Sequence, residues 1–373
     1  MASDTHRGPA LTAAVRPAAE PGVDIAVLLE ATLTRFLDTA TESLLALDDE
    51  LRPLARAVRD AVTGGKRLRP TFSYWAWRGV VGDGAPLRPV LPALAALELL
   101  HAFALVHDDV MDGSATRRGR PTTHRALAAA HADRRLRGDP ERFGQAAAIL
   151  VGDLCLVWAD QMIAAARWAG VPGERLLAAR GQYDRMRVEA IAGQFLDVVS
   201  ESSENWSVER AMRTVRLKTA AYTVVRPLAF GAALGRPVLQ AVRDGYTRYG
   251  LAVGEAFQLR DDLLDVYGDP AVTGKPVGQD LAAGKRTVLL ELARRRATRR
   301  QAGQLRRLLA SGTEADVGRL AALIGETGAT AQVRKMISQR VTEAVAALER
   351  TPIDRRARSA LTDLAATAAW RLT

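Results

Sequence analysis

The sequence predicts a single all-α domain. Ala, Leu, Arg and Glu dominate the chain, and these residues favour helices. Apolar residues recur at the i, i+3, i+4 and i+7 spacing of an amphipathic helix, as in Leu28, Leu29, Leu33, Phe36 and Leu37. Blocks of alternating β-branched residues bounded by tight turns are absent from the sequence, so we expect no strands.

The first residues differ from the rest. Residues 1–24 are small, contain several prolines and show no helical period. We therefore expect a flexible N-terminal segment at 1–24 and one helical domain at 25–373. No linker within 25–373 is long enough to separate two domains.

Turn-like clusters divide this domain into roughly a dozen helices. Each cluster combines Gly, Pro, Ser, Asp or Asn, which favour turns over helices. The clusters are Thr63–Gly65, Val81–Gly84, Ala169–Gly173, Ser200–Asn205 and Gly268–Pro270.

The most apolar stretch, Leu91 to Val106, is interrupted by Pro92, Glu98 and His101. It falls short of the about 20 apolar residues that a membrane span needs. Residues 1–24 also lack the apolar core of a signal peptide. We expect a cytoplasmic protein without a membrane span.

The net charge and the cysteine content exclude some kinds of site and partner. The 373 residues carry 52 Lys and Arg against 42 Asp and Glu, a net charge of +10. A single cysteine, Cys155, excludes an internal disulfide and a cysteine-based zinc site. The basic residues are interleaved with carboxylates that would repel a phosphate backbone, so we expect no nucleic-acid partner.

Two apolar segments end in the same acidic pattern. Residues 98–112 read ELLHAFALVHDDVMD and residues 255–265 read EAFQLRDDLLD. Because i and i+4 share a helix face, Asp108 lies beside Asp112, and Asp261 beside Asp265. Asp109 and Asp262 point about a quarter-turn away.

These carboxylates repel one another and lie among apolar residues, so a cation must offset them. Arginine could do so, but Mg²⁺ fits better because one or two carboxylates, water and phosphate usually hold it. No His or Cys stands at ligand spacing for a transition metal, and the alternating ligands of an EF-hand are absent from the sequence.

A second kind of site follows Thr63. Residues 64–70 read GGKRLRP, which places flexible backbone next to Lys66, Arg67 and Arg69. This is no ATP-binding P-loop, which needs GxxxxGK followed by Ser or Thr. With Arg117, Arg118, Lys218, Lys275 and Lys285, these cations are suited to the oxygens of a metal-bound diphosphate.

The sequence resembles the trans-isoprenyl diphosphate synthases of the polyprenyl synthetase family, most closely bacterial geranylgeranyl diphosphate synthases. The likeness begins near residue 30, and its motifs stand in the family's order. They are GGKRLRP at 64–70, HAFALVHDDVMD at 101–112, RRGRP at 117–121, GQFLD at 193–197, KT at 218–219, FQLRDDLLD at 257–265 and TGKPVGQD with a following GK at 273–285.

The resemblance implies a bundle of antiparallel helices around a deep central cavity, usually in a homodimer. It also implies roles for individual residues. Isopentenyl diphosphate would be held by Lys66, Arg69, His101 and Arg118. The allylic diphosphate would be contacted by Arg117, Lys218, Thr219, Gln258, Lys275 and Lys285. Mg²⁺ would be held by Asp108, Asp112 and Asp261, with Asp109, Asp262 and Asp265 in support.

The implied reaction is ionisation, condensation and elimination. About three Mg²⁺ ions and the basic side chains would stabilise the charge of the departing pyrophosphate. The alkene of isopentenyl diphosphate would attack the allylic cation, and a proton would then be lost. The residues placed at the centre of the reaction are Asp108, Asp112, Asp261 and Lys218.

Product length would depend on the depth of the cavity below the first motif. Phe103 and Ala104 precede Asp108 by five and four positions, about one helical turn. A single bulky residue there predicts a medium-chain product, C20, with C15 as the competing length.

Two other functions stay open on the sequence alone. A class I terpene cyclase would use the first aspartate motif without a second diphosphate pocket. A catalytically silent subunit of a synthase is the non-enzyme alternative, although all six aspartates are present.

Overall fold

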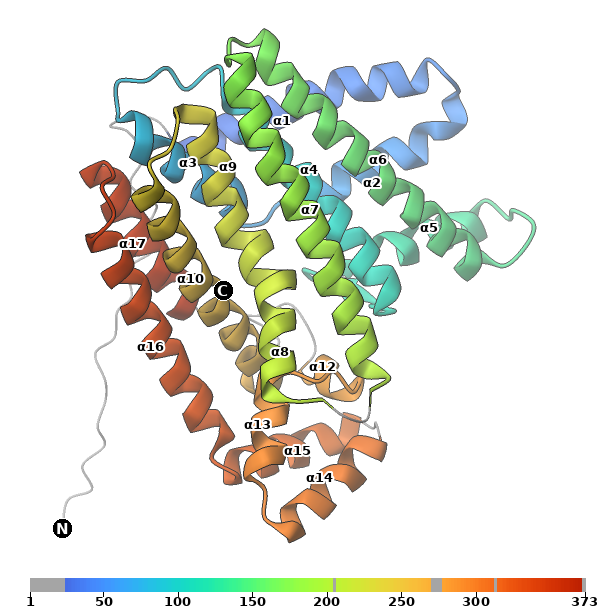
Figure 1. Cartoon of the computed structure of the whole chain (residues 1–373). Coiled ribbons are helices and arrows are strands. Elements are labelled where there is room, and N and C mark those ends of the chain that lie inside the picture. Colours follow the sequence, from blue (N-terminus) through green and yellow to red (C-terminus); the bar gives the residue numbers. More distant parts are fainter. Residues whose placement is uncertain (1–23, 204–205, 270–276, 312–313, 371–373) are drawn as a thin grey trace, which may run out of the picture.

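The computed structural model describes residues 24–203, 206–269, 277–311 and 314–370. Its architecture is an all-helical bundle, as the sequence predicts (Figure 1). The expected flexible segment, residues 1–24, lies outside the described residues except for Asp24.

The bounds of the elements follow the chain. They are α1 (Ile25–Leu45), η1 (Asp49–Leu51), α2 (Arg52–Val62), α3 (Leu68–Val81), α4 (Leu91–Met111), β1 (Thr116–Arg117), β2 (Arg120–Pro121), α5 (Thr123–Asp133), α6 (Pro140–Trp168), α7 (Gly173–Glu201), α8 (Val208–Thr214), η2 (Val215–Val225), α9 (Arg226–Gly235), α10 (Gln240–Tyr267), α12 (Gln279–Ala282), α13 (Val288–Arg296), α14 (Arg299–Ser311), α15 (Glu314–Glu326), α16 (Ala329–Glu349) and α17 (Arg355–Trp370).

The turn clusters fall where helices end. Thr63–Gly65 separates α2 from α3, and both glycines have positive φ, 76° and 91°. L-residues with a side chain rarely adopt this conformation. The paired glycines therefore fix the sharp change of direction that brings the basic segment after them onto the bundle.

One short hairpin departs from the expectation of no strands. β1 and β2 pair antiparallel, with Thr116 opposite Pro121 and Arg117 opposite Arg120. The two residues between them, Arg118 and Gly119, both have positive φ. A two-residue loop of that conformation matches the twist of a hairpin, so it needs no alternating strand pattern to form.

Helix α4 is the core helix of the bundle. Ala93, Leu94, Leu97 and Leu99 have no exposed surface, and α4 packs mainly against α6. Pro92 interrupts the apolar run in the sequence but does not interrupt the helix. Pro92 lies in the first turn, where its missing N–H costs nothing, and the helix continues to Met111.

Among the described residues, two helices reach the length and hydropathy of a membrane span, α4 and α6. This differs from the expectation that no stretch comes close. The most apolar 18-residue stretch of each helix is partly buried inside the protein, to 61% in α4 and to 44% in α6. Core helices of globular proteins satisfy the same criterion, so this similarity is weak evidence for a membrane.

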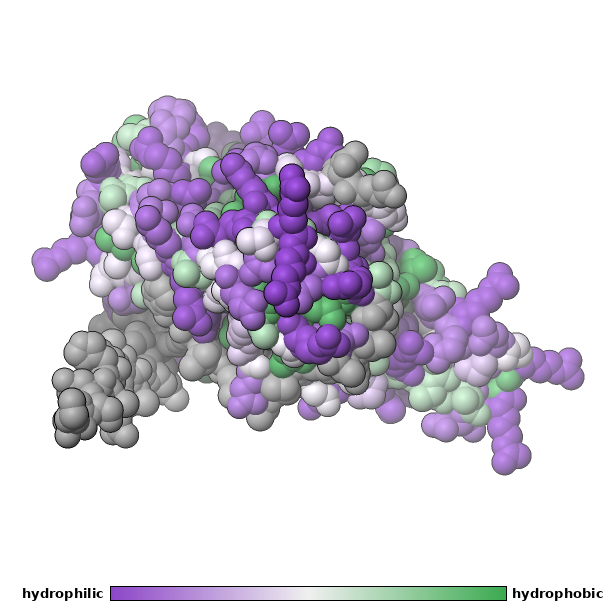
Figure 2. All heavy atoms as spheres, turned by 90° about the horizontal axis from the view of Figure 1, so that it is seen from below, coloured by the Kyte–Doolittle hydropathy of each residue, from purple (hydrophilic) through white to green (hydrophobic). Residues whose placement is uncertain are grey.

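The bundle carries its functional elements at one end. In Figure 1, α7, η2 with α9, and α10 run side by side, and the chain beyond α10 returns through α12 and α13 below them. Figure 2 views the molecule from below, where hydrophobic atoms are scattered among mostly hydrophilic ones. The C-terminal end of α4 and the C-terminal half of α10 both point toward this lower half.

Candidate active site

The first aspartate motif closes helix α4. Asp108 lies in the last turn, Asp109 is only 3% exposed, and Asp112 is the C-cap residue. Arg117, on strand β1, donates to both oxygens of Asp109 and lies 3.4 Å from Asp108. The hairpin therefore holds an arginine against the motif, and Asp109 is engaged by it.

The second aspartate motif lies in the last turns of α10. Asp261 is exposed, whereas Asp262 is 4% exposed. The side chain of Asp265 accepts from the backbone N–H of Asp280, which begins the return of the chain in α12. The three aspartates thus differ in environment, and Asp261 presents its carboxylate to solvent.

Two lysines join the motifs to other elements. Lys218 of η2 donates to Asp108 at 3.0 Å and to Asp197 of α7 at 2.6 Å. Lys285, beyond α12, donates to Asp112 at 2.6 Å and lies 3.6 Å from Asp280. The segment that follows the second motif therefore reaches the first motif directly.

This charge network sets the protonation of its members. Burial works to raise the pKa of Asp108, but Lys218, Lys285 and Arg117 outweigh it and lower the pKa to about 2. Burial and the neighbouring Asp108 raise the pKa of Asp112. Burial opposes the charge of Lys218, yet Asp108 and Asp197 raise its pKa, so this ammonium stays protonated.

A chain of hydrogen bonds links η2 to the second motif. The Thr219 hydroxyl donates to the Gln258 carbonyl oxygen at 2.6 Å, and the Gln258 amide donates to Asp262 at 2.9 Å. Burial raises the pKa of Asp262 well above its usual value, and its Oδ2 has no hydrogen-bond partner. Thr219 and Gln258 are therefore held by each other rather than free.

Arg69, His101 and Arg118 form a basic cluster beside the carboxylates. The Arg69 guanidinium stacks 4.3 Å from the centre of the Tyr222 ring and donates to Thr223 at 2.9 Å. Tyr222 lies 3.4 Å from His101 Nδ1. Burial, and then the charges of Arg69 and Arg118, hold the pKa of His101 well below its usual range.

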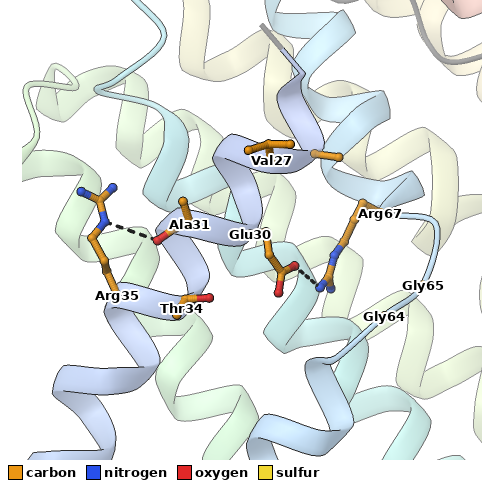
Figure 3. Close-up of a pocket in the computed structure, with 9 residues that line it drawn as sticks. Val27, Glu30, Ala31, Thr34, Arg35, Gly64, Gly65 and Arg67 are labelled. Carbon is orange, nitrogen blue, oxygen red and sulfur yellow. Dashed lines mark hydrogen bonds and ion pairs between the residues drawn. The ribbon is translucent and has the colours of Figure 1, made fainter.

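Arg67 has a different role from Lys66 and Arg69, its neighbours in the basic segment 66–69. Its side chain is buried and donates to Glu98 of α4 and Glu30 of α1, each at 2.5 Å. Figure 3 shows Arg67 reaching from the glycine turn to Glu30 beside an open groove of about 960 Å³. Arg67 ties the turn to two helices and is not available to a ligand.

Arg118 lies over the glycine turn. It donates to the Thr63 carbonyl at 3.1 Å, and a Cβ on Gly65 would lie 2.7 Å from its guanidinium. Burial, and then Arg117, lower the pKa of Arg118. Gly65 therefore leaves room for the Arg118 guanidinium, which lies near the positive charges of Arg117, Arg67 and Arg69.

Both aspartate motifs line one cavity of about 740 Å³. The predicted site residues that line it are Lys66, Asp108, Asp112, Arg117, Lys218, Thr219, Gln258, Asp261, Asp262, Asp265 and Lys285. Arg69, His101 and Arg118 form the adjoining basic cluster. Lys275 lies outside the described residues.

The donor set of the cavity suits a hard divalent cation. Its walls carry carboxylates and neither cysteine nor histidine, and Mg²⁺ prefers oxygen ligands. Among the described residues, no three carboxylates converge closely enough to form a metal site by themselves. A metal would need water or ligand oxygens to complete its coordination, which is the usual mode of Mg²⁺.

Phe103 and Ala104 do not line this cavity. Phe103 is half-buried and its ring meets His107 edge-on, with centroids 4.8 Å apart. His107 in turn lies against Gly152 of α6. The two are so close that a Cβ added to Gly152 would overlap the His107 imidazole. The role of Phe103 as a floor stays a prediction.

Some residues of the site were not assigned from the sequence. Asp280 and Arg286 line the cavity, and Tyr222 and Thr223 hold Arg69. Asp280 stands in the quoted TGKPVGQD stretch, so a signal for it existed. Tyr222 and Thr223 follow the KT pair by three and four positions on the same helical segment, which was the available signal for them.

Comparisons with known proteins agree on one family. Residues 52–326 match the family model described as polyprenyl synthetase. A geranylfarnesyl diphosphate synthase of Aeropyrum pernix is 36% identical over 270 residues, 71% of this chain and 77% of the relative. A geranylgeranyl diphosphate synthase of Mycobacterium tuberculosis is 34% identical over 296 residues, 77% of this chain and 76% of the relative.

Solved structures give the same result. The structure of a geranylgeranyl pyrophosphate synthase from Corynebacterium glutamicum, complexed with isoprenyl diphosphate and magnesium, aligns with a TM-score of 0.87 and 39% identity. The alignment covers 94% of this chain and all of the other.

Proposed function

The chain belongs to the polyprenyl synthetase family and is a prenyltransferase, and we propose that it condenses isopentenyl diphosphate with an allylic diphosphate in the cavity between its aspartate motifs. The observation that carries this proposal is the convergence of both motifs, with Lys218 and Lys285, on one cavity. An allylic diphosphate needs cations on its leaving group and carboxylates for its counter-ions, and this cavity supplies both.

Magnesium is the proposed cofactor, with about three ions in each active site. Asp108 and Asp112 on one side and Asp261 on the other would hold it, with Asp109, Asp262 and Asp265 in support. Bound Mg²⁺ supplies positive charge that stabilises the departing pyrophosphate. The structure of the Corynebacterium glutamicum relative was determined with magnesium, which supports the choice of metal.

The side chains of this cavity would promote ionisation of the allylic C–O bond. Lys218, Lys285 and Arg117 carry fixed positive charge toward the leaving pyrophosphate, where charge develops in the transition state. Thr219 and Gln258 would contact the allylic diphosphate from the η2 and α10 walls. Because these groups are already oriented by hydrogen bonds, little reorganisation accompanies bond breaking.

The basic cluster, together with Lys66 of the cavity wall, would position the second substrate. Lys66, Arg69, His101 and Arg118 would hold the diphosphate of isopentenyl diphosphate so that its alkene faces the allylic carbon. The new C–C bond forms as the alkene attacks, and the proton then lost passes to the pyrophosphate that has left. Closure of the site against water would protect the cation from hydrolysis.

We propose C20 as the main product. Phe103 and Ala104 lie about one turn before Asp108 on α4, so a growing chain that extends along this helix would meet the Phe103 ring. Relatives with similar identity carry names for C20 and C25 products, so the named relatives leave the length open.

A homodimer is the proposed assembly. Large apolar residues are exposed along neighbouring α6 and α7, which Figure 1 shows side by side. They are Phe143, Ile149, Leu150, Val157, Leu177, Val188, Ile191, Phe195, Val198 and Val199. On α7 the spacing of 188, 191, 195 and 198 places them on one face. Exposed apolar residues gathered on two neighbouring helices are typical of a subunit interface.

The test is a condensation assay. Purified protein is incubated with Mg²⁺, labelled isopentenyl diphosphate and each of the C5, C10 and C15 allylic diphosphates, and the products are sized. We expect prenyl diphosphates ending at C20. Hydrocarbon formed from the allylic diphosphate alone would identify a terpene cyclase, and no turnover with any pair would identify a silent subunit.

A further inference from the structure

The segment that carries Lys218 and Thr219 is an unusual helix. η2 is a π-helix of 11 residues, Val215–Val225, continuous with α8 before it and α9 after it. The N–H of Arg226 donates to the Ala221 carbonyl, the i to i−5 bond that defines this geometry. π-Helical turns are rare, mostly single, and concentrated at functional sites.

The π-helical geometry places several polar side chains of η2 on other elements. Lys218 contacts Asp108 and Asp197, Thr219 contacts Gln258, and Thr223 contacts Arg69. Position i of a π-helix shares its face with positions near i+4 and i+5. The segment therefore serves both the carboxylate cavity and the basic cluster.

Part of the cause of the π-helical geometry lies in the sequence next to η2. Pro227 follows η2 and has no N–H to donate, and its ring disfavours an α-helical carbonyl at the i−4 position, Thr223. Proline in a continuous helix is a common origin of a wide or kinked turn. Pro227 ends the π-helix but lies nine residues from Lys218, so it cannot alone fix the catalytic lysine.

Helix α7 presses on the first half of η2 at a glycine. A Cβ added to Gly193 would lie 2.6 Å from the Lys218 Cα and 2.8 Å from the Leu217 carbonyl carbon. Real Cβ atoms essentially never come this close, under 3.0 Å, so one backbone would have to move. The obstructing atoms are main-chain atoms of the lysine residue itself and of its neighbour.

Helix α10 presses on η2 from another side, also at glycines. A Cβ on Gly254 would lie 2.5 Å from the Ala220 Cβ and closer still to the Ala220 Cα. A Cβ on Gly250 would lie 2.9 Å from the Val225 Cα. Thus the residue on each side of Thr219 has its backbone against a glycine of a neighbouring helix.

We propose that Gly193 and Gly254 are positioning residues for prenyl transfer, because they let α7 and α10 hold the π-helix where Lys218 and Thr219 reach the allylic diphosphate. The inference rests on the proposed function and adds residues that touch no substrate. A side chain at either glycine displaces the η2 backbone and carries Lys218 away from Asp108. Misplacement by about 1 Å can cost about 100-fold in rate.

Matched alanine variants test the proposal. Gly193→Ala is compared with Gly144→Ala on α6, where the Cβ would also meet main chain, 2.9 Å from the Ala128 nitrogen. Gly254→Ala is compared with Gly245→Ala on the same helix, where the Cβ would lie 2.7 Å from a Thr351 side-chain carbon. For each variant, kcat, both KM values and the melting temperature are measured on folded protein.

We expect all four variants to melt earlier than the parent protein. Gly193→Ala and Gly254→Ala should also lose about 30- to 100-fold in kcat and show a raised KM for the allylic diphosphate, with the KM for isopentenyl diphosphate within about threefold. Gly144→Ala and Gly245→Ala should keep kcat. An unchanged kcat in the first pair, or an equal loss in the controls, overturns the proposal.

Two further measurements keep the outcome decisive. If the first pair does not fold, Gly250→Ala decides, because its milder overlap should still lower kcat about 3- to 10-fold, and an unchanged kcat refutes the proposal.

Calorimetric titration with Mg²⁺ and inorganic diphosphate is independent of turnover. Gly193→Ala should bind about tenfold more weakly than Gly144→Ala, and equal binding refutes the positioning role even if the parent protein makes no prenyl diphosphate.

Discussion

Lys285 and Asp112 lie 173 positions apart in the chain, and the Lys285 Nζ is 2.6 Å from an oxygen of Asp112. Asp112 caps α4, whereas Lys285 follows the loop and short helix beyond α10. Both residues line the cavity, and the contact neutralises a carboxylate that burial and Asp108 make costly to ionise. The two ends of the site are therefore joined without any ligand.

Replacing Lys285 tests whether its charge serves catalysis. Lys285→Met removes a cation from the leaving pyrophosphate, and we expect kcat to fall about 100-fold or more. Lys335→Met is the control, because Lys335 is exposed on α16 and does not line the cavity. Steady-state kinetics at saturating Mg²⁺ measure both. Equal kcat values for the two variants would remove Lys285 from the reaction.

Glu98 should be needed for the structure of the basic segment. Glu98→Gln removes the buried one of the two carboxylates that pair with Arg67 and leaves the more exposed Glu30 as counter-charge, so we expect a loss of about 2–3 kcal/mol in the free energy of unfolding. Glu50→Gln removes the exposed contact with Arg134 and should cost less than about 1 kcal/mol. Urea denaturation gives both values, and a similar small loss for Glu98→Gln would show that Glu30 alone offsets the Arg67 charge.

His101 should make the ligand-free protein less stable in mild acid. Burial and the charges of Arg69 and Arg118 keep the folded pKa well below 6.5, so below about pH 6.5 the unfolded chain binds a proton that the folded chain does not. The free energy of unfolding then falls as pH drops. His101→Gln should flatten this decline between pH 6.5 and 5 by at most about 1.4 kcal/mol per pH unit. Parallel declines in urea denaturation would contradict the assignment.

Phe103→Ala should lengthen the product beyond C20, because the ring would no longer obstruct a chain growing along α4. Phe36→Ala is the control: Phe36 of α1 packs on Trp158 of α6, so its loss should lower stability without changing the product. Chromatographic sizing of dephosphorylated products gives the answer. The same distribution in both variants would reject Phe103 as the floor.

The exposed apolar face predicts the assembly. Leu150→Asp combined with Ile191→Asp places two charges on the α6 and α7 surface, and we expect the mass in solution to halve. Leu47→Asp, at a residue 77% exposed outside this face, should leave the mass unchanged. Light scattering after size-exclusion chromatography measures both. A parent protein with the mass of one chain would reject the dimer itself.

Local rules predicted the helices and their ends. The i, i+4 spacing placed Asp108 and Asp112 together, and both line the cavity. The glycine pair at 64 and 65 marked a true turn with positive φ. These features depend on neighbours within a few residues, so single-sequence reasoning reaches them.

Contacts between distant segments were out of reach from the sequence. The partner of Arg67, the reach of Lys285 to Asp112 and the π-helical geometry of η2 all depend on packing across the bundle. Pro227 was a visible sign of a distorted helix, but the glycines that crowd η2 lie on α7 and α10. The hairpin was missed because a two-residue turn forms it without a strand pattern.

The account depends on both aspartate motifs holding one magnesium diphosphate together. Calorimetric titration of Mg²⁺ with inorganic diphosphate into the parent protein, Asp112→Asn, Asp261→Asn and the double variant tests this most directly. Each single variant should bind about tenfold more weakly or worse, and the double variant should lose less than the sum of the two single losses. Parent-like binding by Asp261→Asn, or strictly additive losses, would contradict a shared site.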